Sequence, residues 1–167
     1  MTHRGFSIIE VLVALFVLTM GAGAAFVLAT GVSSSGSFVK SQLTASYLAQ
    51  EGIEIVRNIR DSNFLKMRAQ GGSWDEGLEG CEGGCGADYQ DAQLSPALAA
   101  AYLAFDAEEG FYLYGDSPAS SGFRRVITVT QDEGVMRISV AVFWEEKGQE
   151  YDVEAYTELY NWIEPPL

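Results

Sequence analysis

The chain has 167 residues, which is enough for one anchor helix and one globular domain of ordinary size. It carries 23 acidic and 10 basic residues, for a net charge of −13. A surface this acidic repels phosphate backbones, which argues against this protein being a direct receptor for nucleic acids. Only a local basic patch would reverse this, and the longest candidate is Arg124-Arg125.

The N-terminus combines a short basic leader, a glycine, a carboxylate and a long apolar run. The chain reads RGFSIIE at residues 4–10 and then has no charged residue from Val11 to Val39. A run of that length predicts a membrane-spanning helix. Glu10 then lies at the apolar boundary or one turn inside it, where an unpaired ionised side chain costs about 2–3 kcal/mol. We therefore expect its carboxylate to have a partner.

This pattern resembles the processing site of type IV prepilins and pseudopilins, with the similarity running from Gly5 to Gly21. Family members are cut after the glycine by a membrane peptidase on the cytoplasmic side, and the new N-terminal residue is N-methylated. The resemblance implies cleavage after Gly5, methylation of Phe6 and an assembly role for Glu10, which matches the family's glutamate. It also implies three partners: sister pilin or pseudopilin subunits, the prepilin peptidase and an inner-membrane assembly platform.

Two of these residues have simple physical roles under this hypothesis. Without a side chain, Gly5 lets the peptidase approach the backbone closely. Glu10 pairs with the charged Phe6 amine of a neighbouring subunit, and low dielectric strengthens that attraction while desolvation offsets part of it. The alternative for Glu10 is a side chain at headgroup level that turns toward water.

An ordinary secretory signal peptide is the alternative interpretation of the N-terminus. Its basic region would be Arg4, its apolar core Val11–Met20 and its cleavage site the small residues 22–24. A carboxylate at the mouth of the core counts against it, as does an uncharged run that continues past the cut. A plain signal-anchor helix explains the length of the run but not Gly5 together with Glu10.

After a membrane and filament-core segment at residues 6–37, the pattern at residues 38–66 becomes that of a half-buried surface helix. Its apolar stripe consists of Ala45, Leu48, Gly52, Ile55 and Ile59, with Ala49, Ile53 and Val56 beside it. The opposite side carries Glu51, Glu54, Arg57 and Asp61, with Glu54–Arg57 and Arg57–Asp61 at supportive spacings. This segment is predicted to be a stalk that carries a head domain.

Residues 67–122 are predicted to be a mixed αβ-loop region, and they contain the only two cysteines, Cys81 and Cys85. An exported setting permits a disulfide between them, while free or intermolecular thiols and a metal site are the alternatives. Two thiolates without further Cys or His make an incomplete zinc set. Further along, Ser95-Pro96 predicts a short helix at Ala97–Leu103, and residues 105–114 a turn and a strand.

The cysteine loop is also acidic. Its carboxylates are Asp75, Glu76, Glu79, Glu82, Asp88 and Asp91. Several carboxylate oxygens suit Ca²⁺, but no EF-hand spacing is present, so a solvated acidic loop is the preferred interpretation.

Residues 123–164 are predicted to form an antiparallel β-meander. Strand Phe123–Thr130 is followed by a strand in which Met136, Ile138, Val140, Val142 and Trp144 alternate with more polar positions. In the third strand Tyr151, Val153, Ala155, Thr157 and Leu159 face one way. This period of two indicates a sheet with one covered face, and the stalk helix is its expected cover. The expected fold is α+β, a long N-terminal helix packed on a C-terminal meander, which is also the pilin architecture.

The residues offer little for catalysis: we find no nucleophile–base pair, no phosphate-binding glycine signature and no metal set. The single histidine, His3, lies in the predicted leader at residues 1–5, so processing would leave no histidine for a triad or a zinc site. We expect no enzyme activity, no cofactor and no metal. The aromatic side chains fit either sheet packing or a carbohydrate-binding surface. These are Tyr112, Tyr114, Trp144, Tyr156, Tyr160 and Trp162.

The sequence therefore predicts a structural subunit, a minor pilin or pseudopilin of a type IV pilus-like filament. Before assembly it would cross the inner membrane once, with its head outside the cytoplasm. One competing hypothesis is a minor-pilin head that acts as an adhesion or binding module. The other is a membrane-anchored exported protein, an enzyme among the possibilities, that does not enter filaments.

Overall fold

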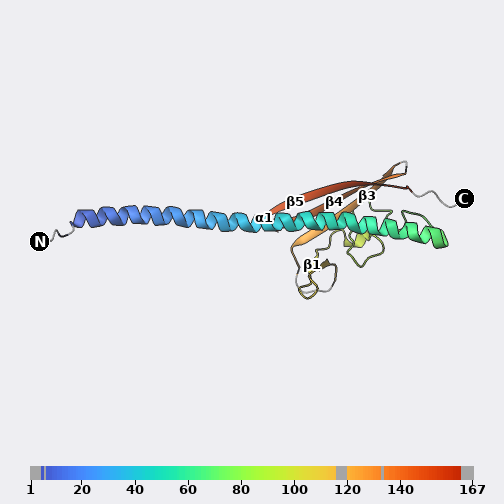
Figure 1. Cartoon of the computed structure of the whole chain (residues 1–167), viewed down its shortest axis with the longest axis horizontal. Helices are drawn as coiled ribbons and strands as arrows, with labels where there is room; N and C mark the ends of the chain where they lie inside the picture. Colours follow the sequence, from blue (N-terminus) through green and yellow to red (C-terminus); the bar gives the residue numbers. More distant parts are fainter. Residues whose placement is uncertain (1–4, 6, 116–119, 133, 163–167) are drawn as a thin grey trace. The chain divides into compact units, whose positions relative to one another are not determined.

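The computed structural model describes residue 5 and residues 7–115, 120–132 and 134–162 (Figure 1). The chain divides into two compact units, Met1–Lys40 and Ser41–Leu167, which we call the anchor unit and the head unit. One α-helix, α1 (Ile8–Gln70), contributes residues to both.

The anchor unit is a bare apolar helix. Its most apolar stretch has a mean hydropathy of 2.5, and none of that stretch is buried by the rest of the protein. Large apolar side chains such as Ile8, Phe16 and Leu28 are well exposed. By length and composition this helix is able to cross a membrane, as predicted.

In the head unit, α1 packs one face against a three-stranded sheet, confirming the predicted α+β layout. The stripe predicted from the sequence is the buried face, with Ala45, Leu48, Ile55 and Ile59 all in the core. Glu54 and Arg57 form the expected ion pair, but Asp61 pairs with Arg60 at 2.7 Å instead of with Arg57.

The helix ends at Gln70, beyond the expected end at residue 66. Gly71 and Gly72 stop it by taking positive φ angles of 76° and 128°, a backbone region that glycine enters without a steric penalty.

The sheet is the predicted meander. Its strands β3 (Phe123–Asp132), β4 (Val135–Glu146) and β5 (Gln149–Tyr160) are antiparallel neighbours in the order β3-β4-β5. Every second residue of β4 from Met136 to Trp144 is buried, and β5 repeats the alternation with Tyr151 to Leu159 on the more covered face. The alternating apolar residues of β4 and β5 therefore lie on the face that α1 covers, as expected.

The prediction of a helix at Ala97–Leu103 is wrong. Only a three-residue 3₁₀ turn forms, η1 (Pro96–Leu98), and Ser95 provides no side-chain cap. The reason is a long-range pairing: the Leu103 N–H donates to the Phe123 carbonyl at 2.8 Å, which pulls the chain into an extended path. The following turn-and-strand segment is two short paired strands, β1 (Ala104–Phe105) and β2 (Tyr112–Leu113).

Gly52 sets how closely α1 approaches the sheet. A Cβ atom at this position would lie 2.7 Å from Val140 Cγ1 and 3.1 Å from Arg125 Cδ. Val140 and Arg125 are both fully buried, so neither has free space into which it can retreat. The helix and β4 therefore meet at a point where only a hydrogen atom fits.

We predict that Gly52→Ala destabilises the head by about 1–2 kcal/mol, because overpacking outweighs a gain in helix propensity of about 1 kcal/mol. Urea unfolding of the full chain in detergent micelles, followed by tryptophan fluorescence, measures this. Gly36→Ala is the matched control, since nothing lies within 4 Å of a Cβ there. Equal midpoints for the two variants would contradict the packing argument.

Candidate functional site

The N-terminal site is exposed where the structure describes it. Gly5 is exposed, and Glu10 is an exposed side chain in the first turn of α1, where the Glu10 N–H donates to the Ser7 carbonyl at 3.1 Å. Phe6, the residue expected to carry the methyl group, lies outside the described residues. A carboxylate in the first helical turn is also favoured by the helix dipole. Within the described residues of this single chain, Glu10 makes no ion pair.

Cys81 and Cys85 are joined by a disulfide, and both are fully buried. The loop they close is bound along the edge of β3. Cys85 and Ile127 exchange two backbone hydrogen bonds of 2.8 Å, and the Val129 N–H donates to the Cys81 carbonyl at 3.2 Å. The disulfide thus fixes a loop that protects one edge of the sheet.

Three of the six carboxylates of the acidic loop, Glu79, Asp88 and Asp91, accept hydrogen bonds from backbone N–H groups. Asp88 accepts from the Gln90 and Tyr114 N–H groups at 3.0 and 2.9 Å, and its own N–H donates to Asp91 at 2.8 Å. Glu79 accepts from the Gly77 N–H at 3.0 Å. In the part of the chain that the structure describes, no three His, Cys, Asp or Glu side chains gather as a metal site.

The most unusual residue of the head is Arg125, whose role the sequence analysis missed. It lies on the inward face of β3 with none of its surface exposed. Its guanidinium donates to the Leu48 carbonyl of α1 at 3.1 Å and to the Ala87 carbonyl of the loop at 2.7 Å, and it lies 3.5 Å from a Glu51 carboxylate oxygen. One buried cation therefore ties together the helix, the loop and the sheet.

Two groups beside Arg125, Glu51 and Tyr114, have raised pKa values. Burial raises the pKa of Glu51, and the nearby Arg125 guanidinium offsets part of that rise. Burial also raises the pKa of Tyr114, whose hydroxyl donates to the Arg125 carbonyl at 3.2 Å. The signal in the sequence was an arginine in phase with the inward residues Phe123, Ile127 and Val129.

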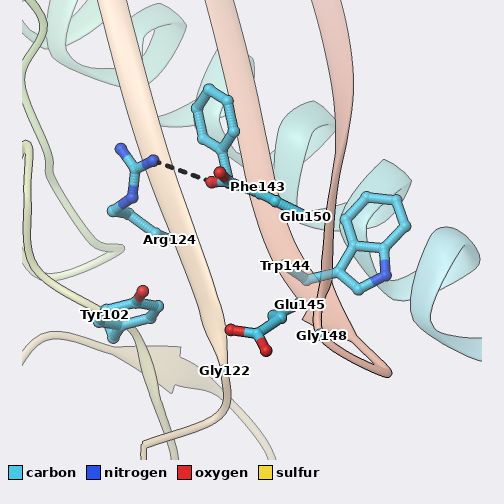
Figure 2. Close-up of a pocket in the computed structure, with 8 residues that line it drawn as sticks. All are labelled: Tyr102, Gly122, Arg124, Phe143, Trp144, Glu145, Gly148 and Glu150. Carbon is cyan, nitrogen blue, oxygen red and sulfur yellow. Dashed lines mark ion pairs between the residues drawn. The ribbon is translucent and has the colours of Figure 1, made fainter.

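The pair Arg124-Arg125 is not a basic patch, because the two side chains point to opposite faces of β3. Arg124 is on the outer face, 4.3 Å above the Phe143 ring and 3.5 Å from Glu150 (Figure 2). These side chains line a hollow of about 240 Å³ whose wall also includes Tyr102, Trp144 and Glu145. Since Glu150 and Phe143 already engage the guanidinium, the hollow offers no unpaired cation to an anionic ligand.

The aromatic side chains divide between the two expected roles. Tyr112, Phe123 and Trp144 form a chain of ring contacts with centroid separations of 6.2 and 6.3 Å, so they pack the sheet. Tyr156, Tyr160 and Trp162 are exposed. Sheet packing therefore explains the first group and leaves three exposed rings on and after β5, of which Trp162 contacts the Phe64 ring at a centroid separation of 5.4 Å.

We predict that Arg125→Ala lowers the free energy of unfolding by about 3–5 kcal/mol, because it empties a buried site and strips the Ala87 carbonyl of its donor. Arg124→Ala is the matched control and should cost less than about 1 kcal/mol, as is usual for a partly exposed ion pair. Urea unfolding of the full chain compares them. Similar losses from both variants would contradict the central role of Arg125.

Comparison with known proteins identifies the N-terminus. Residues 1–26 match the family model described as the prokaryotic N-terminal methylation motif. The chain matches no curated protein and no solved structure. The match covers Gly5, Phe6 and Glu10 and most of the exposed apolar helix, so this chain bears the type IV prepilin-type N-terminal signature.

Proposed function

We propose that this chain is a minor pilin or pseudopilin, processed after Gly5 and assembled through its N-terminal helix into a type IV pilus-like filament. The observation that carries the proposal is the methylation motif at residues 1–26, which overlaps an apolar helix that its own chain leaves uncovered. A membrane covers such a surface before assembly, and neighbouring helices cover it in a filament. The prepilin peptidase, an inner-membrane platform and sister subunits are the proposed partners.

Charge favours a minor subunit over an abundant one. The full-length chain has a net charge of −13, and removal of residues 1–5 takes away one positive side chain, Arg4. Heads of the same sequence packed side by side would repel one another, and salt screens this only beyond about 8 Å at physiological ionic strength. An acidic subunit is better accommodated among subunits of other sequence.

The proposal assigns no catalytic role to the head. Among the described residues, three carboxylates of the loop bind backbone groups, and the arginine that lines the hollow near Phe143 is already paired with Glu150. One observation favours a second role as a binding module, namely the exposed aromatic side chains Tyr156, Tyr160 and Trp162. Such rings suit contact with another macromolecule.

The first test is the intact mass of the protein from membranes, with and without the prepilin peptidase. We expect loss of residues 1–5 and gain of one methyl group only when the peptidase is present. Gly5→Val should leave the full-length precursor, because a side chain blocks the peptidase from the backbone. A cut near Ala24, or normal processing of Gly5→Val, would overturn the assignment.

The second test concerns assembly. We predict that Glu10→Leu is still processed but enters filaments at least about tenfold less, a change that corresponds to roughly 1.4 kcal/mol of lost interaction. Quantitative immunoblots of sheared filaments and of membranes measure the ratio. Glu108→Leu, which removes an exposed carboxylate from the head, is the matched control. Equal incorporation of both variants would remove Glu10 from the assembly mechanism.

A further inference from the structure

The two edges of the head sheet are treated differently. The edge of β3 is covered, since Leu103, Cys81 and Cys85 all form backbone hydrogen bonds with it. β5 is the other edge strand, and among the described residues it pairs with β4 alone (Figure 1). It is twelve residues long and contains no proline. A long unpaired edge of this kind is a template for an additional strand.

The inner side of this edge is incompletely covered. Val153, Ala155 and Thr157 are only half-buried, although Val142 and Val140, which face the first two across the ladder, are fully buried. A groove of about 520 Å³ runs between β5 and α1. Its lining is mixed: Tyr47, Gln50, Glu51, Ile53, Glu54 and Arg57 come from α1, and Tyr156 and Thr157 from β5.

On the α1 side of this groove, Tyr47 is 63% exposed. A strand paired with β5 would extend the sheet, and its inward side chains would cover the apolar part of this groove.

The outer face of β5 carries four carboxylates, Glu150, Asp152, Glu154 and Glu158, and the rings of Tyr156 and Tyr160. Hydrogen bonds from the Ser139 and Tyr156 hydroxyls lower the pKa of Glu154, and those from Tyr160 and Arg137 lower the pKa of Glu158. Arg124 pairs with Glu150 and Arg137 with Glu158, at 3.5 and 3.2 Å. Asp152 and Glu154, at the middle of the strand, have no ion pair with a described cation.

The carboxylates on the outer face of β5 determine which kind of strand is able to pair with it. In an antiparallel pair, residues directly opposite each other share a face of the sheet. A second copy of β5 would therefore place acidic residues opposite or diagonal to acidic residues on the outer face, which is destabilising. A strand with lysine or arginine at alternate positions would instead place its cations beside Asp152 and Glu154 and its other residues over the groove.

We propose that the outer edge of β5 binds an extended segment of another protein, with cationic residues at alternate positions and apolar residues between them. Backbone hydrogen bonds supply the pairing, the carboxylates fix the register and the groove accepts the apolar side chains. The surface belongs to the head unit, so this binding goes beyond the filament role and does not depend on cleavage after Gly5.

The probe is a fluorescent ten-residue peptide that alternates lysine with valine and threonine. Its binding to the full chain in detergent micelles is measured by fluorescence anisotropy at physiological salt. A second peptide has the same sequence with alternate backbone amides N-methylated on the edge facing β5, so it keeps the charge but cannot pair. We expect the N-methylated peptide to bind at least tenfold more weakly. Equal affinities would overturn the proposal, because general attraction to an acidic protein would then explain the binding.

Matched charge reversals locate the surface. Asp152→Lys with Glu154→Lys should weaken binding of the lysine peptide at least tenfold. Glu82→Lys with Glu108→Lys makes the same change of charge at exposed positions away from β5 and should weaken it no more than about twofold. Equal losses would overturn the proposal. The comparison of the two peptides uses the unmodified protein, so it remains decisive even if a charge-reversal variant fails to fold.

Discussion

The buried guanidinium of Arg125 is the interaction on which the head depends. It bonds to a carbonyl of α1 and to one of the cysteine loop, and it is itself part of β3. Burying a cation costs several kcal/mol in desolvation, and the two carbonyls together with Glu51 offset that cost only when all three elements are in place. A partly assembled head would leave the charge uncompensated. The arginine therefore penalises arrangements in which any of the three elements is displaced.

Gly52 is needed for the same contact between α1 and Arg125. Arg125 reaches the Leu48 carbonyl only because the helix lies close to the sheet, and the missing side chain at Gly52, one turn further along α1, permits that approach. A larger residue there would push on Val140 and on the arginine together. Substitutions at Gly52 and Arg125 should therefore be energetically coupled, since each disturbs the contact that the other requires.

The sequence predicts those parts of the fold that depend on local period. The buried stripe of α1 and the alternation of β4 and β5 follow from spacings of 3.6 and 2 residues, which require no knowledge of distant partners. The two largest failures involve long-range contacts. Leu103 leaves its expected helix to bond with Phe123, and Arg125 finds carbonyls 77 and 38 positions away in the chain. The sequence shows that Arg125 alternates in step with the inward-facing residues of β3, but it does not show which carbonyl groups the side chain binds. The N-terminal motif was recognisable because it is a linear signal.

The asymmetry of the sheet edges suggests how an acidic head can associate with other proteins. A disulfide-closed loop occupies the β3 edge, so a strand cannot add there. On β5 the carboxylates allow an added strand but penalise one of like charge. Edge-to-edge aggregation of identical heads is thereby suppressed, while a cationic segment remains acceptable. Repulsion among copies and selectivity for a different partner are then two consequences of one row of charge, and both suit a subunit present in few copies among others.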